Sequence, residues 1–223
     1  MKGMYETIIL EKFSEMPVFS LADISQITRS KAYAKFLASS LLKKGKIRKI
    51  KRDLYTLHDD AFLVATFILR PSYISSISAL SFYRDISQIP NEIFCITNKS
   101  PKVFYFIQRI RFFHSKFFFG FEEKEYKGFK ILVADREKAI IDSIGKVPIY
   151  VFEEAFEKVN VERILEYVER IGKRSLAKRI GYLLEEHGYE VYPRLKKFID
   201  NKFVFLDPIV KGKRKNEKWR VIL

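Results

Sequence analysis

The sequence is poor in the residue types that build disulfides and metal sites. It contains one cysteine, Cys95, and three well-separated histidines, His58, His114 and His187. A single thiol excludes a disulfide within the chain, and histidines this far apart give no metal-ligand spacing. We therefore expect no metal and no cofactor.

Long apolar runs are missing as well. No stretch reaches the roughly 18 to 20 apolar residues that a membrane-spanning helix requires. The N-terminus lacks the order of basic, apolar and small residues that is typical of a signal peptide. These absences predict a cytoplasmic protein that does not associate with membranes.

Familiar catalytic motifs are absent too. The nine glycines are dispersed and form neither a phosphate-binding loop nor a dinucleotide-binding pattern. One weak pattern remains, because Asp85 followed by Glu125 and Lys127 has the acid, then acid-x-lysine order of metal-dependent nucleases. Glu-x-Lys arises often by chance in a chain that is 31% charged. We expect no enzyme and keep a nuclease as the weakest alternative.

What the sequence does have is positive charge. It carries 42 Lys and Arg against 27 Asp and Glu, a formal net charge of +15. Clustered lysine and arginine attract nucleic-acid phosphates, although a lysine-rich surface also serves solubility alone. The stretch from position 29 to position 52 contains no acid and ten basic residues: Arg29, Lys31, Lys35, Lys43, Lys44, Lys46, Arg48, Lys49, Lys51 and Arg52.

This basic stretch coincides with a predicted pair of helices. Ser20 is typical of the N-cap of a short helix over 21–27. Ser30 predicts the cap of a second helix over 31–44, which Gly45 ends. The short spacing between them is typical of a helix-turn-helix, whose second helix lies in the DNA major groove.

The chain after this pair alternates between apolar and basic residues, with a turn at Arg52 and Asp53. This pattern predicts a hairpin, and the whole segment 19–58 is interpreted as a winged helix-turn-helix. Tyr33 has two open interpretations, contact with a thymine methyl group or packing inside the protein. The residues expected to contact DNA are Ser30, Lys31, Tyr33 and Lys35 from the second helix, and Arg48, Lys49, Lys51 and Arg52 from the wing.

The remaining pattern predicts an α+β fold. A winged helix-turn-helix domain over 1–60 precedes a larger mixed α/β domain over 61–223, whose last third is helical. Strand-like ends at 203–206 and 219–222 are expected to pair with or extend the earlier sheet. The other predicted strands cover 92–97, 102–108, 110–113, 116–121 and 130–133, and the other predicted helices cover 5–14, 61–69, 76–83, 136–144 and 149–159, with two more capped by Asn160 and Ser175.

Two further groups of residues allow more than one interpretation. The aromatic segment 112–121 offers rings for base stacking, but phenylalanines in strand-like segments more often fill a core, which we favour. The basic residues around the last predicted helix either extend the contacts with DNA or a toxin, or form solvated helix surface. They are Lys173, Arg174, Lys178 and Arg179, together with the cluster over 211–220.

Three segments resemble the AbiEi antitoxin family, in which a predicted transcriptional regulator is encoded beside a nucleotidyltransferase toxin in phage-defence systems. They are YISSISALSFYRDISQIPNEIFCIT from Tyr73, FFFGFEEKEYKGFKILVADREKAIIDSI from Phe117, and SLAKRIGYLLEE from Ser175 with the terminal KWRVIL. Two positions depart from the family pattern. Asp53 stands where such wings usually have Gly, and Arg136 replaces the usual proline after the acid.

The resemblance implies an antitoxin of a type IV, AbiE-like toxin-antitoxin system for abortive infection and antiviral defence. Such a protein represses its own operon through the winged helix, on operator DNA, while its C-terminal domain neutralises the nucleotidyltransferase toxin. The residues alone support the DNA-binding half of this expectation. The alternative is a solitary transcriptional regulator without a toxin partner, which the neighbouring gene would distinguish.

Overall fold

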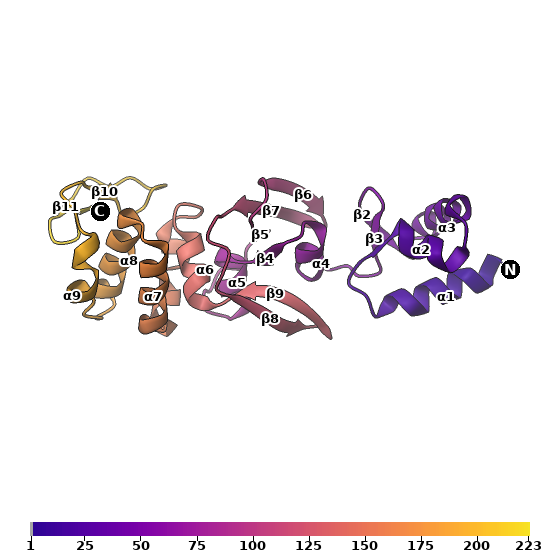
Figure 1. The fold of residues 1–223 in the computed structure, drawn as a ribbon, viewed down its shortest axis with the longest axis horizontal. Coiled ribbons are helices and arrows are strands. Elements are labelled where there is room, and N and C mark those ends of the chain that lie inside the picture. Colours follow the sequence, from indigo (N-terminus) through magenta and orange to yellow (C-terminus); the bar gives the residue numbers. More distant parts are fainter. Residues whose placement is uncertain (1) are drawn as a thin grey trace.

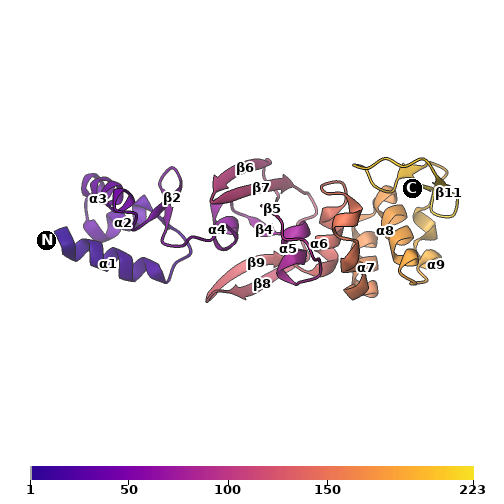
Figure 2. The same ribbon diagram turned by 180° about the vertical axis from the view of Figure 1, so that it is seen from behind.

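The computed structural model describes residues 2–223, with side chains from Gly3 onward. The molecule is elongated and contains both helices and β-sheets. The α+β class that the sequence predicts is confirmed. The N-terminal helices lie at one end, the largest sheet lies in the middle and a group of helices forms the other end (Figure 1). The reverse view shows the same three parts in line (Figure 2).

The N-terminal part begins with helices that are capped by side chains. Ser20 and Asp23 form a reciprocal capping box, with Ser20 N donating to Asp23 Oδ2 at 2.6 Å. Ser30 Oγ accepts a hydrogen bond from Tyr33 N at 3.3 Å, which caps the next helix as predicted. The elements here are α1 (Lys2–Ser14), β1 (Phe19–Ser20), α2 (Leu21–Thr28), α3 (Lys31–Lys43), β2 (Arg48–Lys51) and β3 (Leu54–Thr56).

These elements enclose a small hydrophobic core of their own. Its strands form an antiparallel sheet in the order β1-β3-β2. Phe13 and Phe19 stack with their ring centres 4.3 Å apart. The buried members of this core are Ile9, Phe13, Phe19, Leu21, Ile24, Ala34, Leu37, Ala38, Leu41, Ile47 and Tyr55.

The middle of the molecule is a six-stranded mixed sheet in the order β6-β7-β5-β4-β9-β8. The pairs β5–β7 and β4–β9 are parallel, and the other neighbours are antiparallel. Its strands are β4 (Ser72–Ile74), β5 (Glu92–Thr97), β6 (Lys102–Phe106), β7 (Gln108–His114), β8 (Phe121–Tyr126) and β9 (Phe129–Ala134), and the helices packed with it are α4 (Ala61–Ile68), α5 (Ser76–Phe82) and α6 (Arg136–Ser143).

The C-terminal third is helical and ends in a small separate sheet in the order β10-β12-β11. Trp219 is buried against Gly181, where a Cβ would come within 2.2 Å of the indole ring, so only glycine fits there. The elements are η1 (Ile149–Val151), η2 (Glu153–Lys158), α7 (Val161–Ile171), α8 (Arg174–Glu186), α9 (Tyr192–Leu195), η3 (Lys196–Phe198), β10 (Val204–Phe205), β11 (Lys215–Asn216) and β12 (Val221–Ile222).

Several local predictions were wrong. The segment 116–120 is irregular rather than a strand, and 149–159 forms two 3-10 helices in place of one α-helix. The helix expected to be capped by Ser175 begins two residues earlier, with Lys173 at its N-cap. The strand-like ends pair with each other instead of extending the earlier sheet, because β10 lies parallel to β12.

A second, larger hydrophobic cluster runs from the sheet into the C-terminal helices. It includes Ile50 from β2, and Val18 and Leu54 pack against it, so the base of the hairpin contacts the larger part of the molecule. The division into domains over 1–60 and 61–223 stays a prediction. The predicted aromatic core is present, since Phe112 is buried and Phe117, Phe118 and Phe119 pack against the cluster.

Candidate nucleic-acid interface

Helices α2 and α3 are joined by two residues only. The first, Arg29, has a φ of +54°, a left-handed conformation that turns the chain sharply. The Thr28 side chain supports the turn, because its hydroxyl lies 3.1 Å from both Ile24 O and Ser30 O. The turn fixes the start of α3 relative to α2, and α3 is the helix on which the sequence places the DNA contacts.

Helix α3 has one apolar side, which faces the N-terminal core. Ala34, Leu37 and Leu41 are buried in the N-terminal core. Lys31 and Lys35 lie on the other side of the helix and are exposed. Neither lysine has an ion-pair partner among residues 2–223, so both ammonium groups are directed to solvent.

The β2–β3 hairpin carries the wing residues. A register irregularity lies between Lys49 and Lys51, and the turn residue Asp53 has a φ of +57°. Asp53 therefore adopts the conformation for which such wings use glycine, and aspartate is among the residues that tolerate it. Asp53 O accepts a hydrogen bond from Leu21 N at 3.1 Å, which ties the turn to the start of α2. Lys49 is exposed, and the Arg52 side chain is 95% exposed.

The two other wing cations are engaged within the chain. Lys51 Nζ donates to Ile68 O at 2.5 Å and lies 5.8 Å from the centre of the Phe104 ring. Burial and the neighbouring charge of Lys102 lower the pKa of Lys51. Arg48 forms an ion pair with Asp59. These contacts direct Arg48 and Lys51 toward the chain beyond the hairpin, which the sequence did not predict.

The basic stretch retains an uncompensated charge. Glu6 forms ion pairs with Lys44 and Lys46, whose ammonium groups lower the pKa of its carboxyl. Among the residues that the structure describes, six of the ten basic side chains have no acidic partner within 4.0 Å: Arg29, Lys31, Lys35, Lys43, Lys49 and Lys51. Such an excess creates a positive local potential that attracts polyanions.

Tyr33 lies mainly among other aromatic rings. Its ring meets Tyr5 edge-on, with centres 5.7 Å apart, and stacks on Phe36 at 6.0 Å. This geometry favours packing over a contact with thymine. Sequence reasoning missed Phe36, which is 49% exposed on α3 and lies outside the stripe of buried residues. Helix periodicity was the signal that would have found it, because the spacing of the buried residues leaves Phe36 on the outer side of α3.

The four basic residues predicted near the last long helix separate into two kinds. Lys173 and Arg174 are exposed at the start of α8. Lys178 is 1% exposed, and its ammonium group is held by Asp200 Oδ1, Asp200 O and Lys202 O. Lys178 is therefore not available to contact DNA or a toxin, contrary to expectation. Arg179 is half-buried, with Nε donating to Phe205 O at 2.8 Å.

The nuclease pattern places its residues in separate contacts. Asp85 is buried and forms ion pairs with Arg136 and Lys158. Lys127 forms an ion pair with Asp60, the N-cap residue of α4. Within residues 2–223, no group of three or more His, Cys, Asp or Glu side chains is arranged to hold a metal ion.

None of the helices in the described part of the chain combines the length and the apolar character that a membrane span requires.

Comparison with known proteins identifies the fold. No protein-family model matches this chain, and no curated protein matches it in sequence. The chain is similar to the crystal structure of the RV2827C protein from Mycobacterium tuberculosis, with a TM-score of 0.66 and 9% sequence identity. The similarity covers 98% of this chain and 90% of that chain. The similarity in fold therefore extends over nearly the whole chain.

Proposed function

We propose that this chain is a DNA-binding transcriptional regulator that binds double-stranded operator DNA through α3 and the β2–β3 hairpin as a winged helix-turn-helix. The observation that carries the proposal is the uncompensated positive charge over 29–52, on the surface where Lys31, Lys35 and Lys49 are exposed. Phosphate contacts by such residues supply most of the affinity, while the start of α3 reaches base edges.

Two positions of the hairpin, Arg48 and Lys51, have other roles than the sequence predicts. Lys49 and Arg52 reach phosphates from the hairpin, while Lys31 and Lys35 reach phosphates and base edges from the start of α3. Arg48 and Lys51 hold the hairpin against the larger domain, through Asp59 and Ile68 O. The Ser30 hydroxyl donates a hydrogen bond to a phosphate, while its oxygen accepts the capping hydrogen bond of α3. The Tyr33 ring packs against Tyr5 and stabilises the helix.

The test is a fluorescence-anisotropy titration of duplex DNA from the region upstream of the gene. Lys31→Ala combined with Lys35→Ala is expected to weaken binding about tenfold or more at moderate salt, and to reduce the slope of log affinity against log salt by about two. Lys12→Ala combined with Lys130→Ala removes the same charge from exposed positions elsewhere and is the matched control. Equal losses in both double variants would refute a specific interface.

The antitoxin half of the proposal rests on the resemblance to the AbiEi family. In it, the protein represses its own operon in the cytoplasm, and its larger domain neutralises a nucleotidyltransferase toxin in phage defence. The supporting experiment is co-purification with the product of an adjacent nucleotidyltransferase gene, together with relief of growth arrest when both are expressed. Without such a neighbour, the protein is a solitary regulator. Magnesium-dependent DNA cleavage that Glu125→Gln abolishes would support a nuclease instead.

A further inference from the structure

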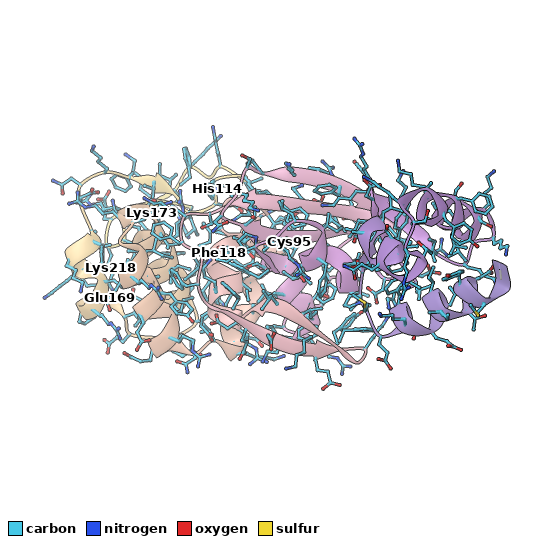
Figure 3. All side chains as sticks on the ribbon, turned by 45° about the vertical axis from the view of Figure 1, so that its right-hand side comes forward. Cys95, His114, Phe118, Glu169, Lys173 and Lys218 are labelled. Atoms are coloured by element: carbon cyan, nitrogen blue, oxygen red, sulfur yellow. The ribbon has the colours of Figure 1, made fainter. Side chains whose placement is uncertain are left out.

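A polar pocket lies in the larger domain, away from the helix-turn-helix. Its volume is 230 Å³, and four separate segments contribute to it. His114 and Ser115 come from the end of β7, Phe117 comes from the irregular segment that follows, and Lys138 to Lys146 come from α6 and the turn after it. The fourth segment is the start of α8, from Lys173 to Arg179. Figure 3 labels His114 and Lys173, which lie near each other in that view.

The charges that line this pocket do not balance. Asp142 is its one carboxylate, and it is fully engaged by groups of the protein. Lys138 Nζ lies 2.5 Å from Oδ1, while Ser75 Oγ and Tyr73 OH donate to Oδ2 at 2.8 and 3.1 Å. Lys138 is 0% exposed, so the Lys138–Asp142 ion pair is buried and carries no net charge at the base of the pocket.

Three further cations line the pocket without a carboxylate partner of their own among the described residues. Lys146 Nζ donates to the backbone oxygen of Asp142. Arg179 Nε donates to Phe205 O, and Lys173 Nζ lies 5.3 Å from the centre of the Phe117 ring. These partners are neutral, so they leave the positive charges uncompensated.

The pKa of Lys146 reflects this excess of positive charge in the pocket. Burial lowers the pKa of Lys146, and the charges of Lys138 and Lys173 lower it further, against the opposite effect of Asp142. Asp207 acts on Arg179 from the far side, but its carboxylate already accepts hydrogen bonds from the backbone amides of Ile149 and Ile209. An anion in the pocket would relieve this repulsion among the lysines.

The start of α8 adds a second source of positive potential. The helix has 13 residues, and no side chain caps its first turn. Ser175 and Leu176 from that turn line the pocket. The amides of Leu176 and Ala177 already donate to Lys173 O at 3.0 Å, so Ser175 is the residue of this turn whose amide can meet a ligand. The helix dipole at such a terminus also favours a bound anion. Ser175, which the sequence predicts to be the cap, instead lines the pocket in the first turn.

His114 provides a polar group on the opposite wall. Its Nδ1 lies 3.1 Å from Lys99 O, and a carbonyl accepts, so Nδ1 carries the proton. This leaves Nε2 as the other polar atom of the ring.

We propose that this pocket binds a phosphate group of a small ligand, either free phosphate or pyrophosphate or the phosphate chain of a nucleotide. Lys146, Lys173 and Arg179 neutralise its charge, and Ser175 donates hydrogen bonds to its oxygens from the start of α8. The proposal goes beyond DNA binding and does not depend on it, because α6 and α8, which line the pocket, lie in a different part of the molecule from α3 (Figures 1 and 2).

The test is isothermal titration of the full chain, without DNA, with phosphate, pyrophosphate and ATP. Lys173→Ala is expected to raise the Kd of the tightest of these ligands about tenfold, because a charge-assisted contact is lost. Arg174→Ala is the matched control, since this neighbouring arginine is exposed and pairs with Asp200 outside the pocket, and it should leave the Kd within twofold. Circular dichroism establishes that both variants are folded.

The source of the phosphate follows from the ratio of affinities. Equal binding of pyrophosphate and ATP indicates recognition of the phosphates alone, whereas tighter binding of ATP indicates a nucleotide. Three outcomes would overturn the proposal: no binding of any of these ligands at millimolar concentration, equal effects of Lys173→Ala and Arg174→Ala, or loss of binding in the Lys31→Ala, Lys35→Ala variant. The last result would place the anion on the DNA-binding surface instead.

Discussion

The N-terminal basic stretch and the basic residues of the larger domain use the same side chains in opposite ways. Lys31 and Lys35 on α3 are exposed without an acidic partner in the described chain, whereas Lys138 and Lys178 are almost fully buried and hydrogen-bonded. A buried ammonium group must be paired, because its desolvation is costly, while an exposed one is free to attract phosphate. Burial therefore separates the cations that have a structural use from those that remain available to a polyanion.

The sharpest test of the structural use is Lys138→Met. It leaves the Asp142 carboxylate buried with only hydroxyl donors, and the free energy of unfolding is expected to fall by about 3–5 kcal/mol. Urea denaturation followed by circular dichroism measures the change. Lys138→Met combined with Asp142→Leu removes both charges and should regain much of the loss. A single variant as stable as the unmodified chain would contradict the buried pair.

A smaller effect is expected at Asp200, the partner of Lys178. The hydrogen bond from Lys178 lowers the pKa of Asp200 from 3.8 to about 2. A lowered carboxyl pKa stabilises the folded state above the unfolded value, and the contribution disappears as pH falls through the folded value. Asp200→Asn should therefore lower the urea midpoint at pH 7, and the difference from the unmodified chain should shrink as pH falls from about 4 to 2. A difference as large at pH 2 as at pH 7 would rule out this ion pair as its cause.

The β2–β3 hairpin provides a comparison between two nearby lysines. Lys49 is exposed, while Lys51 is bonded to Ile68 O. We expect Lys49→Ala to weaken DNA binding about fivefold, as the loss of one phosphate contact does. Lys51→Ala should change affinity by less than twofold and lower thermal stability instead. Anisotropy titrations and melting curves of the two variants distinguish these outcomes, and reversed effects would assign the phosphate contact to Lys51.

The smallest expected effect is that of Tyr33→Phe. The substitution keeps the ring between Tyr5 and Phe36 and removes only the hydroxyl, so DNA affinity should stay within twofold. A loss of tenfold or more in the same anisotropy titration would show that the hydroxyl contacts DNA.

Local signals in the sequence predicted local structure well. Side-chain capping by Ser20, Ser30 and Asn160 is present where the sequence places it, because a cap depends on residues three positions apart. Capping by Ser175 was wrong, since α8 begins two residues earlier than this cap implies and the serine lines a pocket instead. The 116–120 segment has strand composition but packs its phenylalanines without pairing, which no local pattern distinguishes.

The candidate interface was predictable in part. Composition and spacing placed Lys31 and Lys35 on the outer face of α3, because helix periodicity alone determines which side the core takes. The partner of Lys51 was not predictable, since Ile68 lies in the next helix and the hydrogen bond depends on how two parts of the chain pack. Neither Lys51 nor Ile68 has neighbours in the sequence that indicate such a long-range contact.

By itself, the sequence determined the α+β composition, the helix pair with its caps and hairpin, and the concentration of charge over 29–52. These depend on neighbours along the chain, for which propensity, capping and periodicity are sufficient. Only the tertiary structure decided which cations are buried, which remain exposed and which meet around the start of α8. Burial and pairing depend on side chains brought together from distant segments, as the approach of His114, Lys146 and Lys173 to one pocket illustrates.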